Sequence, residues 1–218
     1  MNVYPSILTD EIEIVEEQME LCKNNPDVEI IQVDIIDGFF VDNLTIYPSD
    51  LNDVNFGDLR IDFHLMTQEP MDFVHEIRDS KDLLPVRAVI GQIEQMSSQE
   101  AFLKEVKKNG WMAGLSLDLH TPLESIEEDA WEFIDVIQIM GNKAGFHGQE
   151  FNVSALNILS ELHDLIEDKG LDIEIIVDGG IELDNVKEIE DHDADSVAPE
   201  NGLWKAENFD DAYSDFLD

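Results

Sequence analysis

The side chains best suited to chemistry in this sequence are two aspartates and a histidine that stand near the ends of short apolar runs. Asp34 and His64 each lie late in such a run, and Asp178 closes another directly before Gly179 and Gly180. Two carboxylates that face each other can remove a proton from one side of a carbon atom and deliver one to its other side. These residue types therefore predict proton-transfer chemistry, provided that the fold brings them together.

The elements that must position these side chains follow from the pattern of apolar residues. Short runs rich in Ile and Val alternate with longer segments of helical periodicity, which is typical of an α/β fold. Strands are predicted at eight runs, namely residues 2–6, 29–34, 60–65, 86–90, 113–117, 134–140, 173–178 and 194–198. Reacting groups of a (β/α)8 barrel lie at the carboxyl ends of its strands, where these three side chains stand.

The intervening segments are predicted to be helices that cover the strands. In residues 10–23, apolar side chains recur at helical spacing among glutamates, and the other predicted helices are 69–78, 97–108, 122–133, 153–169, 182–191 and 206–217. Thr121 and Pro122 resemble a cap followed by a first-turn proline. Residues 44–58 are expected to be a loop with at most a short helix. We expect one (β/α)8 TIM barrel domain over residues 1–218, with an open doubly wound sheet as the alternative.

The charge balance restricts the partners of the protein. The chain has 51 Asp and Glu against 12 Lys and Arg, a formal charge of −39, which repels nucleic acid and anionic membranes. An acidic coat that maintains solubility is favoured over an acidic docking surface. Cys22 is the only cysteine, and no apolar run is long enough for a membrane helix or an export signal. A cytoplasmic protein without nucleic-acid or membrane partners is therefore expected.

Six short motifs carry a resemblance to a known family. The segment Q-V-D-I-I-D-G-F-F-V-D-N at 32–43 is accompanied by P-S-I-L at 5–8, H-L-M at 64–66, G-L-S-L-D at 114–118, M-G-N-K-A-G-F-H-G-Q at 140–149 and V-D-G-G-I at 177–181. Together they resemble the ribulose-phosphate 3-epimerase family over nearly the whole chain. The resemblance implies a ribulose-phosphate-binding type of barrel that inverts C3 of a ketose phosphate, by default ribulose 5-phosphate and xylulose 5-phosphate.

The resemblance also implies a set of site residues. Asp34 and Asp178 would be acid and base on opposite faces of the sugar, and would hold one divalent metal ion (Zn, Fe, Mn or Co) together with His64. Gln32 replaces a second histidine of the family, and Ser6, Met66 and Ile36 match positions near the substrate. The implied phosphate-binding residues are Gly145, Phe146, Gly148, Gly179, Gly180, Asn201 and Gly202.

Two substitutions leave a second interpretation open. An amide oxygen at Gln32 suits harder metal ions better than zinc, and Glu200 stands where the family has glycine, near the implied phosphate. His147 occupies a position that is normally small. The first hypothesis is an active metal-dependent epimerase that forms a cis-enediolate. The alternative is a non-catalytic or re-specialised sugar-phosphate-binding barrel without the full metal site. A homo-oligomer is left open.

Overall fold

The computed structural model describes residues 1–217, and its nine strands form one parallel sheet. The strands are β1 (Asn2–Val3), β2 (Ser6–Ile7), β3 (Ile30–Ile36), β4 (Arg60–Met66), β5 (Val86–Gln92), β6 (Met112–Leu117), β7 (Val136–Met140), β8 (Glu174–Asp178) and β9 (Ser196–Ala198). Their order in the sheet is β1-β9-β8-β7-β6-β5-β4-β3-β2.

This strand order closes the sheet because β1 and β2 are consecutive pieces of one extended segment. β1 pairs with β9, whereas β2 pairs with β3. Pro5 lies between the two pieces and has no N–H to donate, but its carbonyl oxygen accepts the N–H of Gln32 at 2.9 Å. The eight predicted runs therefore form a barrel whose first strand is divided, which confirms the predicted fold class. The expectation of one domain over residues 1–218 stays a prediction.

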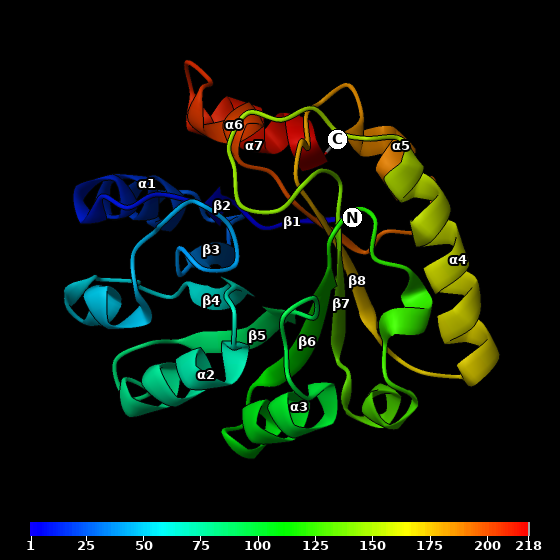
Figure 1. Ribbon diagram of the computed structural model, residues 1–218. Coiled ribbons are helices and arrows are strands. Elements are labelled where there is room, and N and C mark those ends of the chain that lie inside the picture. Colours follow the sequence, from blue (N-terminus) through cyan, green and yellow to red (C-terminus); the bar gives the residue numbers. More distant parts are fainter. Residues whose placement is uncertain (218) are drawn as a thin grey trace.

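Helices cover the outside of the strands (Figure 1). They are α1 (Ile12–Asn24), α2 (Pro70–Asp79), α3 (Gln99–Lys108), α4 (Ser154–Lys169), α5 (Val186–Glu190), α6 (Asn201–Trp204) and α7 (Phe209–Leu217). Helix α1 buries Val15, Met19 and Cys22 against the barrel, as its periodicity predicts. The segment expected to be a loop contains the short 3-10 helix η1 (Pro48–Asp53). Within residues 1–217, no helix combines the length and the apolar character needed to cross a membrane.

The helix predicted at residues 122–133 is wrong. The segment forms two 3-10 helices, η2 (Leu123–Ser125) and η3 (Glu128–Phe133). The buried Gln99 side chain separates them, because its amide donates to the carbonyl oxygen of Ser125 at 2.8 Å and accepts the N–H of Glu127 at 2.9 Å. These backbone groups are therefore unavailable to a continuous helix. Thr121 is not a cap either, since η2 has Pro122 at its N-cap position and no side-chain cap, and the Thr121 hydroxyl donates to Glu94 at 2.6 Å.

The amino ends of the strands are joined by a buried ionic network. Arg87 of β5 donates to Asp62 of β4 at 2.7 Å and to Glu174 of β8 at 2.9 Å. Asp62 is fully buried, so its charge is tolerated only because the guanidinium neutralises it. This network connects strands on different sides of the barrel and leaves the opposite, carboxyl end of the strands for the site.

Candidate active site

The three side chains singled out in the sequence meet inside the carboxyl end of the barrel. Asp34 and His64 are side by side in the register of β3 and β4, and Asp178 is the last residue of β8. The Nδ1 atom of His64 lies 3.0 Å from Oδ1 of Asp34 and 3.3 Å from Oδ2 of Asp178. His64 is fully buried, and the two aspartates are almost so. The parallel register therefore assembles the site from strands far apart in the sequence.

Gln32 and Ser6 complete the immediate surroundings of the two carboxylates. The Nε2 group of Gln32 donates to Oδ1 of Asp34 at 2.9 Å and to Oδ2 of Asp178 at 2.7 Å. The Ser6 hydroxyl donates to Oδ2 of Asp34 at 2.8 Å. Gln32 thus lies between the two acids, which places it where the sequence predicted a metal ligand.

Burial and mutual charge change the protonation of this cluster. Burial opposes the charged form of His64, but its hydrogen bonds to Asp178 and Asp34 and their negative charges outweigh burial and raise its pKa to about 9. Burial, and then the negative charge of Asp34, raises the pKa of Asp178, with His64 acting in the opposite direction. Asp178 therefore binds a proton more readily than an exposed aspartate, as a general acid requires.

Two further glutamines belong to the cluster, and the sequence reasoning missed both. Gln138 of β7 donates from Nε2 to Oδ2 of Asp178 at 3.0 Å. With its amide oxygen turned towards His64, Gln92 of β5 accepts from Nε2 of that ring at 3.2 Å. This contact keeps a proton on Nε2, so that Nδ1 of His64 becomes the ligand atom once it gives up its own proton. Buried glutamines late in apolar strands were the available signal, since such amides need a nearby polar partner.

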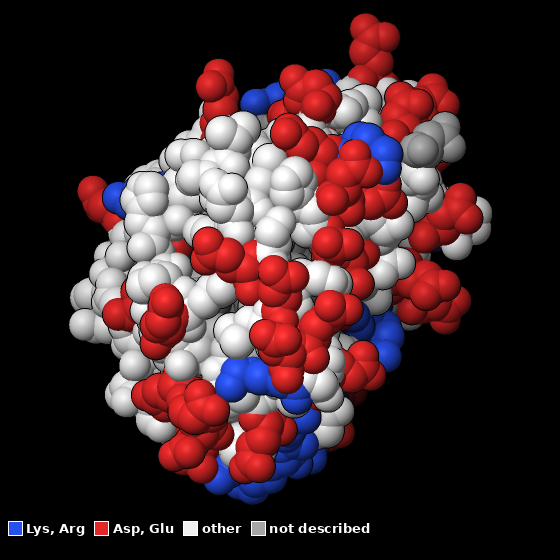
Figure 2. Space-filling model, turned by 90° about the vertical axis from the view of Figure 1, so that its right-hand side faces the viewer, with Lys and Arg blue, Asp and Glu red and all other residues white. Residues whose placement is uncertain are grey.

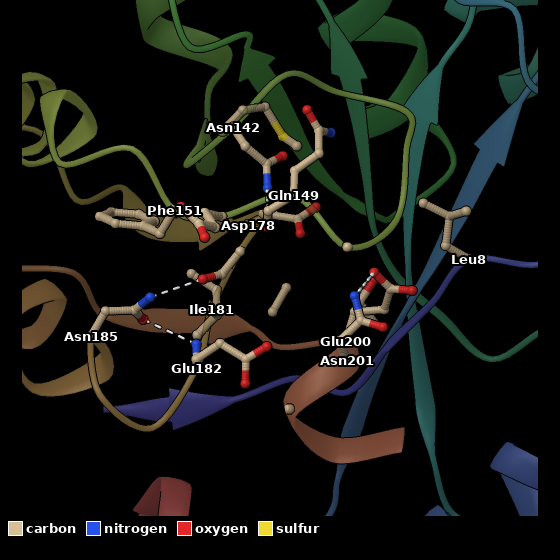
Figure 3. A pocket seen from close by; sticks show the side chains of 18 of the residues that line it. Leu8, Asn142, Gln149, Phe151, Asp178, Ile181, Glu182, Asn185, Glu200 and Asn201 are labelled. Carbon is tan, nitrogen blue, oxygen red and sulfur yellow. Dashed lines mark hydrogen bonds between the residues drawn. The ribbon is translucent and has the colours of Figure 1, made fainter. Parts of the chain in front are cut away.

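A pocket of about 710 Å³ opens above the cluster, a volume sufficient for a small metabolite. Figure 3 shows Asp178, Glu182 and Glu200 around this pocket. Ser6, Asp34 and Met66 also line it, whereas Gln32 and His64 lie beneath its surface. All of the phosphate-binding residues predicted from the resemblance line the pocket: Gly145, Phe146, Gly148, Gly179, Gly180, Asn201 and Gly202.

Ile36 contributes to an apolar cluster beside the pocket and does not line it. It packs with Met66, Met140 and Ala144, all of which are buried. Met140 reaches the pocket together with Met66. The two thioethers therefore supply apolar surface to the pocket, while Ile36, which the sequence analysis placed near the substrate, packs against them.

Glycines let the loops after β7 and β8 approach each other. Gly179 and Gly180 have φ angles of 97° and 73°, in the region that favours glycine. A Cβ atom on Gly180 would lie 2.4 Å from the backbone nitrogen of Phe151. The hydrogen bond from the Gly141 N–H to the Asp178 carbonyl oxygen, at 2.5 Å, also joins the two loops. Close backbone contact thus holds together the two loops that form this wall of the pocket.

Glu200 and His147 form an ion pair at the pocket mouth. Oε1 of Glu200, in the loop before α6, contacts Nδ1 of His147, in the loop after β7. Burial raises the pKa of Glu200, and the positive charge of His147 acts against this shift. Glu200 and His147, which both depart from the family at positions near the implied phosphate, are therefore partners. Their contact joins the loop after β7 to the loop before α6.

Carboxylates dominate the lining of the pocket. Its acidic residues are Asp34, Glu150, Asp178, Glu182, Asp184, Glu188 and Glu200, and its lining includes one lysine, Lys205. Backbone N–H groups, rather than basic side chains, must therefore supply most of the attraction for an anion.

The donor set fits a divalent metal ion. Among residues 1–217, Asp34, His64 and Asp178 form the one cluster of such ligands, and their donor atoms lie within 4.8 Å of one another. Gln32 adds a buried amide whose Oε1 has no hydrogen-bond partner in the described chain. Two carboxylates, one imidazole and a free amide oxygen are all established types of metal ligand.

A closed parallel barrel with its polar site at the carboxyl ends of the strands defines the class of TIM-barrel enzymes. The fold resembles KGPDC from Streptococcus mutans in complex with D-R5P, with a TM-score of 0.74 and 13% identity over 99% of this chain and 95% of that chain. It also resembles phosphoribosyl anthranilate isomerase from Thermus thermophilus, with a TM-score of 0.67 and 11% identity over 100% and 98% of the two chains. At these identities the likeness shows the fold alone.

Similarity in sequence identifies the family. Residues 2–203 match the model of the ribulose-phosphate 3 epimerase family. The chain is 33% identical over 180 residues to ribulose-phosphate 3-epimerase of Escherichia coli, covering 81% of this chain and 77% of the relative. It is 31% identical over 184 residues to the Bacillus subtilis protein of that name, covering 83% and 82%. The chain therefore belongs to the ribulose-phosphate 3-epimerase family, a family of carbohydrate epimerases.

Proposed function

We propose that this protein inverts C3 of a ketose phosphate, with ribulose 5-phosphate and xylulose 5-phosphate as the default pair. The observation that carries the proposal is that Asp34 and Asp178 both contact one imidazole, His64, at the floor of a pocket that admits a small metabolite. Membership in the epimerase family supports the same reaction.

In the proposed mechanism, the two aspartates exchange protons with opposite faces of the substrate. One carboxylate removes the C3 proton beside the ketone, and the other carboxylic acid delivers a proton to the opposite face of the resulting cis-enediolate. The raised pKa of Asp178 suits it to hold a proton between these steps. Ser6 and Gln32 orient Asp34 through their hydrogen bonds.

A divalent metal ion would be held by Asp34, His64, Asp178 and Gln32. When bound, such an ion supplies positive charge against the negative charge that develops on the substrate oxygens. Near the reacting carbon, Met66 with Ile36 behind it would keep the site apolar, because both side chains belong to one buried cluster.

The phosphate group of the substrate would lie at the glycine-rich wall. Gly179 and Gly180 follow β8, Gly145, Phe146 and Gly148 follow β7, and Asn201 and Gly202 follow β9, so their backbone groups surround one side of the pocket. Successive N–H groups in such loops attract anions without a basic side chain.

The cytoplasmic location and the homo-oligomeric state of this protein stay predictions.

Deuterium exchange at C3 tests this proposal. The purified protein, supplied with a divalent metal ion at high salt, is incubated with ribulose 5-phosphate in deuterated buffer and followed by NMR. We expect deuterium at C3 and the appearance of xylulose 5-phosphate. Asp34→Asn and Asp178→Asn should each reduce both rates by about 100- to 10,000-fold. Asp42→Asn, an exposed carboxylate on the loop after β3, is the matched control and should leave them unchanged.

One observation favours a second candidate, namely an epimerase re-specialised for another ketose. Glu200 brings a carboxylate to the wall where phosphate would bind. If folded, metal-supplied protein exchanges no proton of ribulose 5-phosphate but does exchange one of a different ketose or ketose phosphate, this candidate replaces the first. If no sugar is exchanged, both candidates are wrong.

A further inference from the structure

Two amide oxygens in the proposed site lack a hydrogen-bond donor within the described chain. They are Oε1 of Gln32 and Oε1 of Gln138, and both side chains are fully buried. Their Nε2 groups donate to the same atom, Oδ2 of Asp178, at 2.7 and 3.0 Å. An unpaired buried acceptor is unfavourable, because it has given up its hydrogen bond to water without gaining another. The site as it stands therefore leaves two acceptors unsatisfied beside one carboxylate.

Turning the amides does not by itself remove this cost. A half-turn of the terminal amide exchanges oxygen and nitrogen, since the two groups have nearly the same shape. The two amide oxygens would then face Oδ2 of Asp178. Hydrogen-bond acceptors at such short distances repel one another unless a positive charge lies between them. A bound cation is the partner that satisfies both turned oxygens and the carboxylate at once.

We propose that Gln138 is a metal ligand that acts together with Gln32, Asp34, His64 and Asp178. On ion binding, the amides of Gln32 and Gln138 would turn and present their oxygens. The donor set would then contain four oxygen-bearing side chains and one imidazole. This inference rests on the proposed function only in assuming that the cluster binds a metal ion.

Gln92 does not have the same role, although it lies in the same cluster. With its amide oxygen turned towards His64, that oxygen accepts from the His64 ring at 3.2 Å and from the hydroxyl of Ser116 at 3.1 Å. Its acceptor is already satisfied, so it positions His64 from outside. The unpaired oxygen therefore distinguishes Gln138 from its neighbour.

The predicted donor set determines which ions the site prefers. Carboxylate and amide oxygens suit Mn²⁺ and Mg²⁺, whereas sites rich in imidazole suit Zn²⁺. Five protein ligands also exceed the four that zinc commonly takes in tetrahedral sites. Relative to a site with histidine at position 32, this chain should therefore favour Mn²⁺ over Zn²⁺.

Metal binding by the whole protein, measured without substrate, tests the proposal. Mn²⁺ affinity is determined by electron paramagnetic resonance titration, and Zn²⁺ affinity by competition with a chelator. We expect Gln138→Leu to weaken Mn²⁺ binding by about tenfold or more. Gln138→Glu, which keeps an oxygen but loses the N–H donor, should restore Mn²⁺ binding. Gln32→His should shift the preference towards Zn²⁺ by about tenfold.

Side-chain amide signals report the same event in the wild-type protein. Saturation with Mg²⁺, a diamagnetic substitute for Mn²⁺, should shift the carbonyl carbon and amide nitrogen signals of both Gln32 and Gln138. The buried Gln99, whose amide already bonds the backbone of Ser125 and Glu127, is the matched control. Its signals should not move, and Gln99→Leu should leave Mn²⁺ affinity unchanged.

Three results would overturn the proposal. One is wild-type Mn²⁺ affinity in folded Gln138→Leu. Another is equal weakening by Gln138→Leu and Gln138→Glu, which would make Gln138 only a hydrogen-bond donor to Asp178. The third is the absence of ion binding by the wild-type protein, while deuterium exchange at C3 would still decide the epimerase proposal separately. If Gln138→Leu does not fold, the amide signals and Gln138→Glu give the answer.

Discussion

At the scale of single residues, the chemistry of the site depends on partners that alter the usual behaviour of each group. His64 remains fully buried because two carboxylates lie beside Nδ1, and together they raise its pKa to about 9. Burial raises the pKa of Glu200 at the pocket mouth, and the positive charge of His147 beside it opposes this shift. The effect of each charged side chain on substrate binding is therefore best measured with two variants, one that removes this side chain and one that removes its partner.

Glu200→Gly should lower the KM for a ketose phosphate by about tenfold, or about 1.4 kcal/mol, because it removes a negative charge beside the proposed phosphate site. His147→Ala should raise the KM, because it leaves Glu200 without its compensating charge. Steady-state kinetics at constant high salt would measure both effects. Glu161→Gln, an exposed carboxylate on α4 that does not line the pocket, is the control and should leave KM unchanged. A raised KM in Glu200→Gly would show that the pair helps to bind the substrate.

At the scale of elements, the strands place Asp34, His64 and Asp178, and the loops after the strands shape the pocket. The loop between β7 and α4 packs against the loop between β8 and α5 through backbone contacts around Gly141 and Gly180. A side chain at position 141 does not fit between these two loops, since a Cβ atom there would lie 2.4 Å from the Gly179 carbonyl oxygen. The spacing of the two loops is therefore fixed by glycine.

Gly180→Ala should destabilise the protein by about 1–3 kcal/mol, because it combines an unfavourable φ angle with a clash against Phe151. It should also raise the KM, since the glycine-rich wall must move. Gly170→Ala, at the end of α4, has a similar φ of 64° but no atom within 4 Å of the added Cβ. It should lower stability and leave KM unchanged. Urea denaturation of both variants measures the loss of stability caused by the strained backbone. Steady-state kinetics of both variants measures whether the loop has moved.

At the scale of the whole molecule, negative charge is spread over the surface. Figure 2 shows many acidic side chains on the face that carries α4 and α5, beside a largely uncharged area at its upper left and a group of basic side chains along its lower edge. The formal charge of −39 must raise the free energy of the compact state through self-repulsion. Salt shortens the range of this repulsion to about 3 Å at 1 M ionic strength. Stability and salt concentration are therefore linked.

Raising KCl from about 0.1 M to above about 1 M should raise the Tm, because repulsion between like charges is screened more strongly than the ion pairs of the buried Arg87 network. Differential scanning calorimetry in KCl, with sucrose as a nonionic control, would measure this effect. The sign is what matters: a Tm that falls with KCl would show that exposed ion pairs contribute more to stability than the charge excess removes.

The sequence by itself determined the alternation of strands and helices, the positions of Asp34, His64 and Asp178 at strand ends, and the family motifs. These features are local, because apolar periodicity and strand-end position can be read from neighbouring residues. The error at residues 122–133 arose because the Gln99 side chain, more than 20 positions away, captures the backbone there. Gln92, Gln138 and the His147–Glu200 pair were decided only by the tertiary structure. Their roles depend on contacts across the barrel, which no local pattern records.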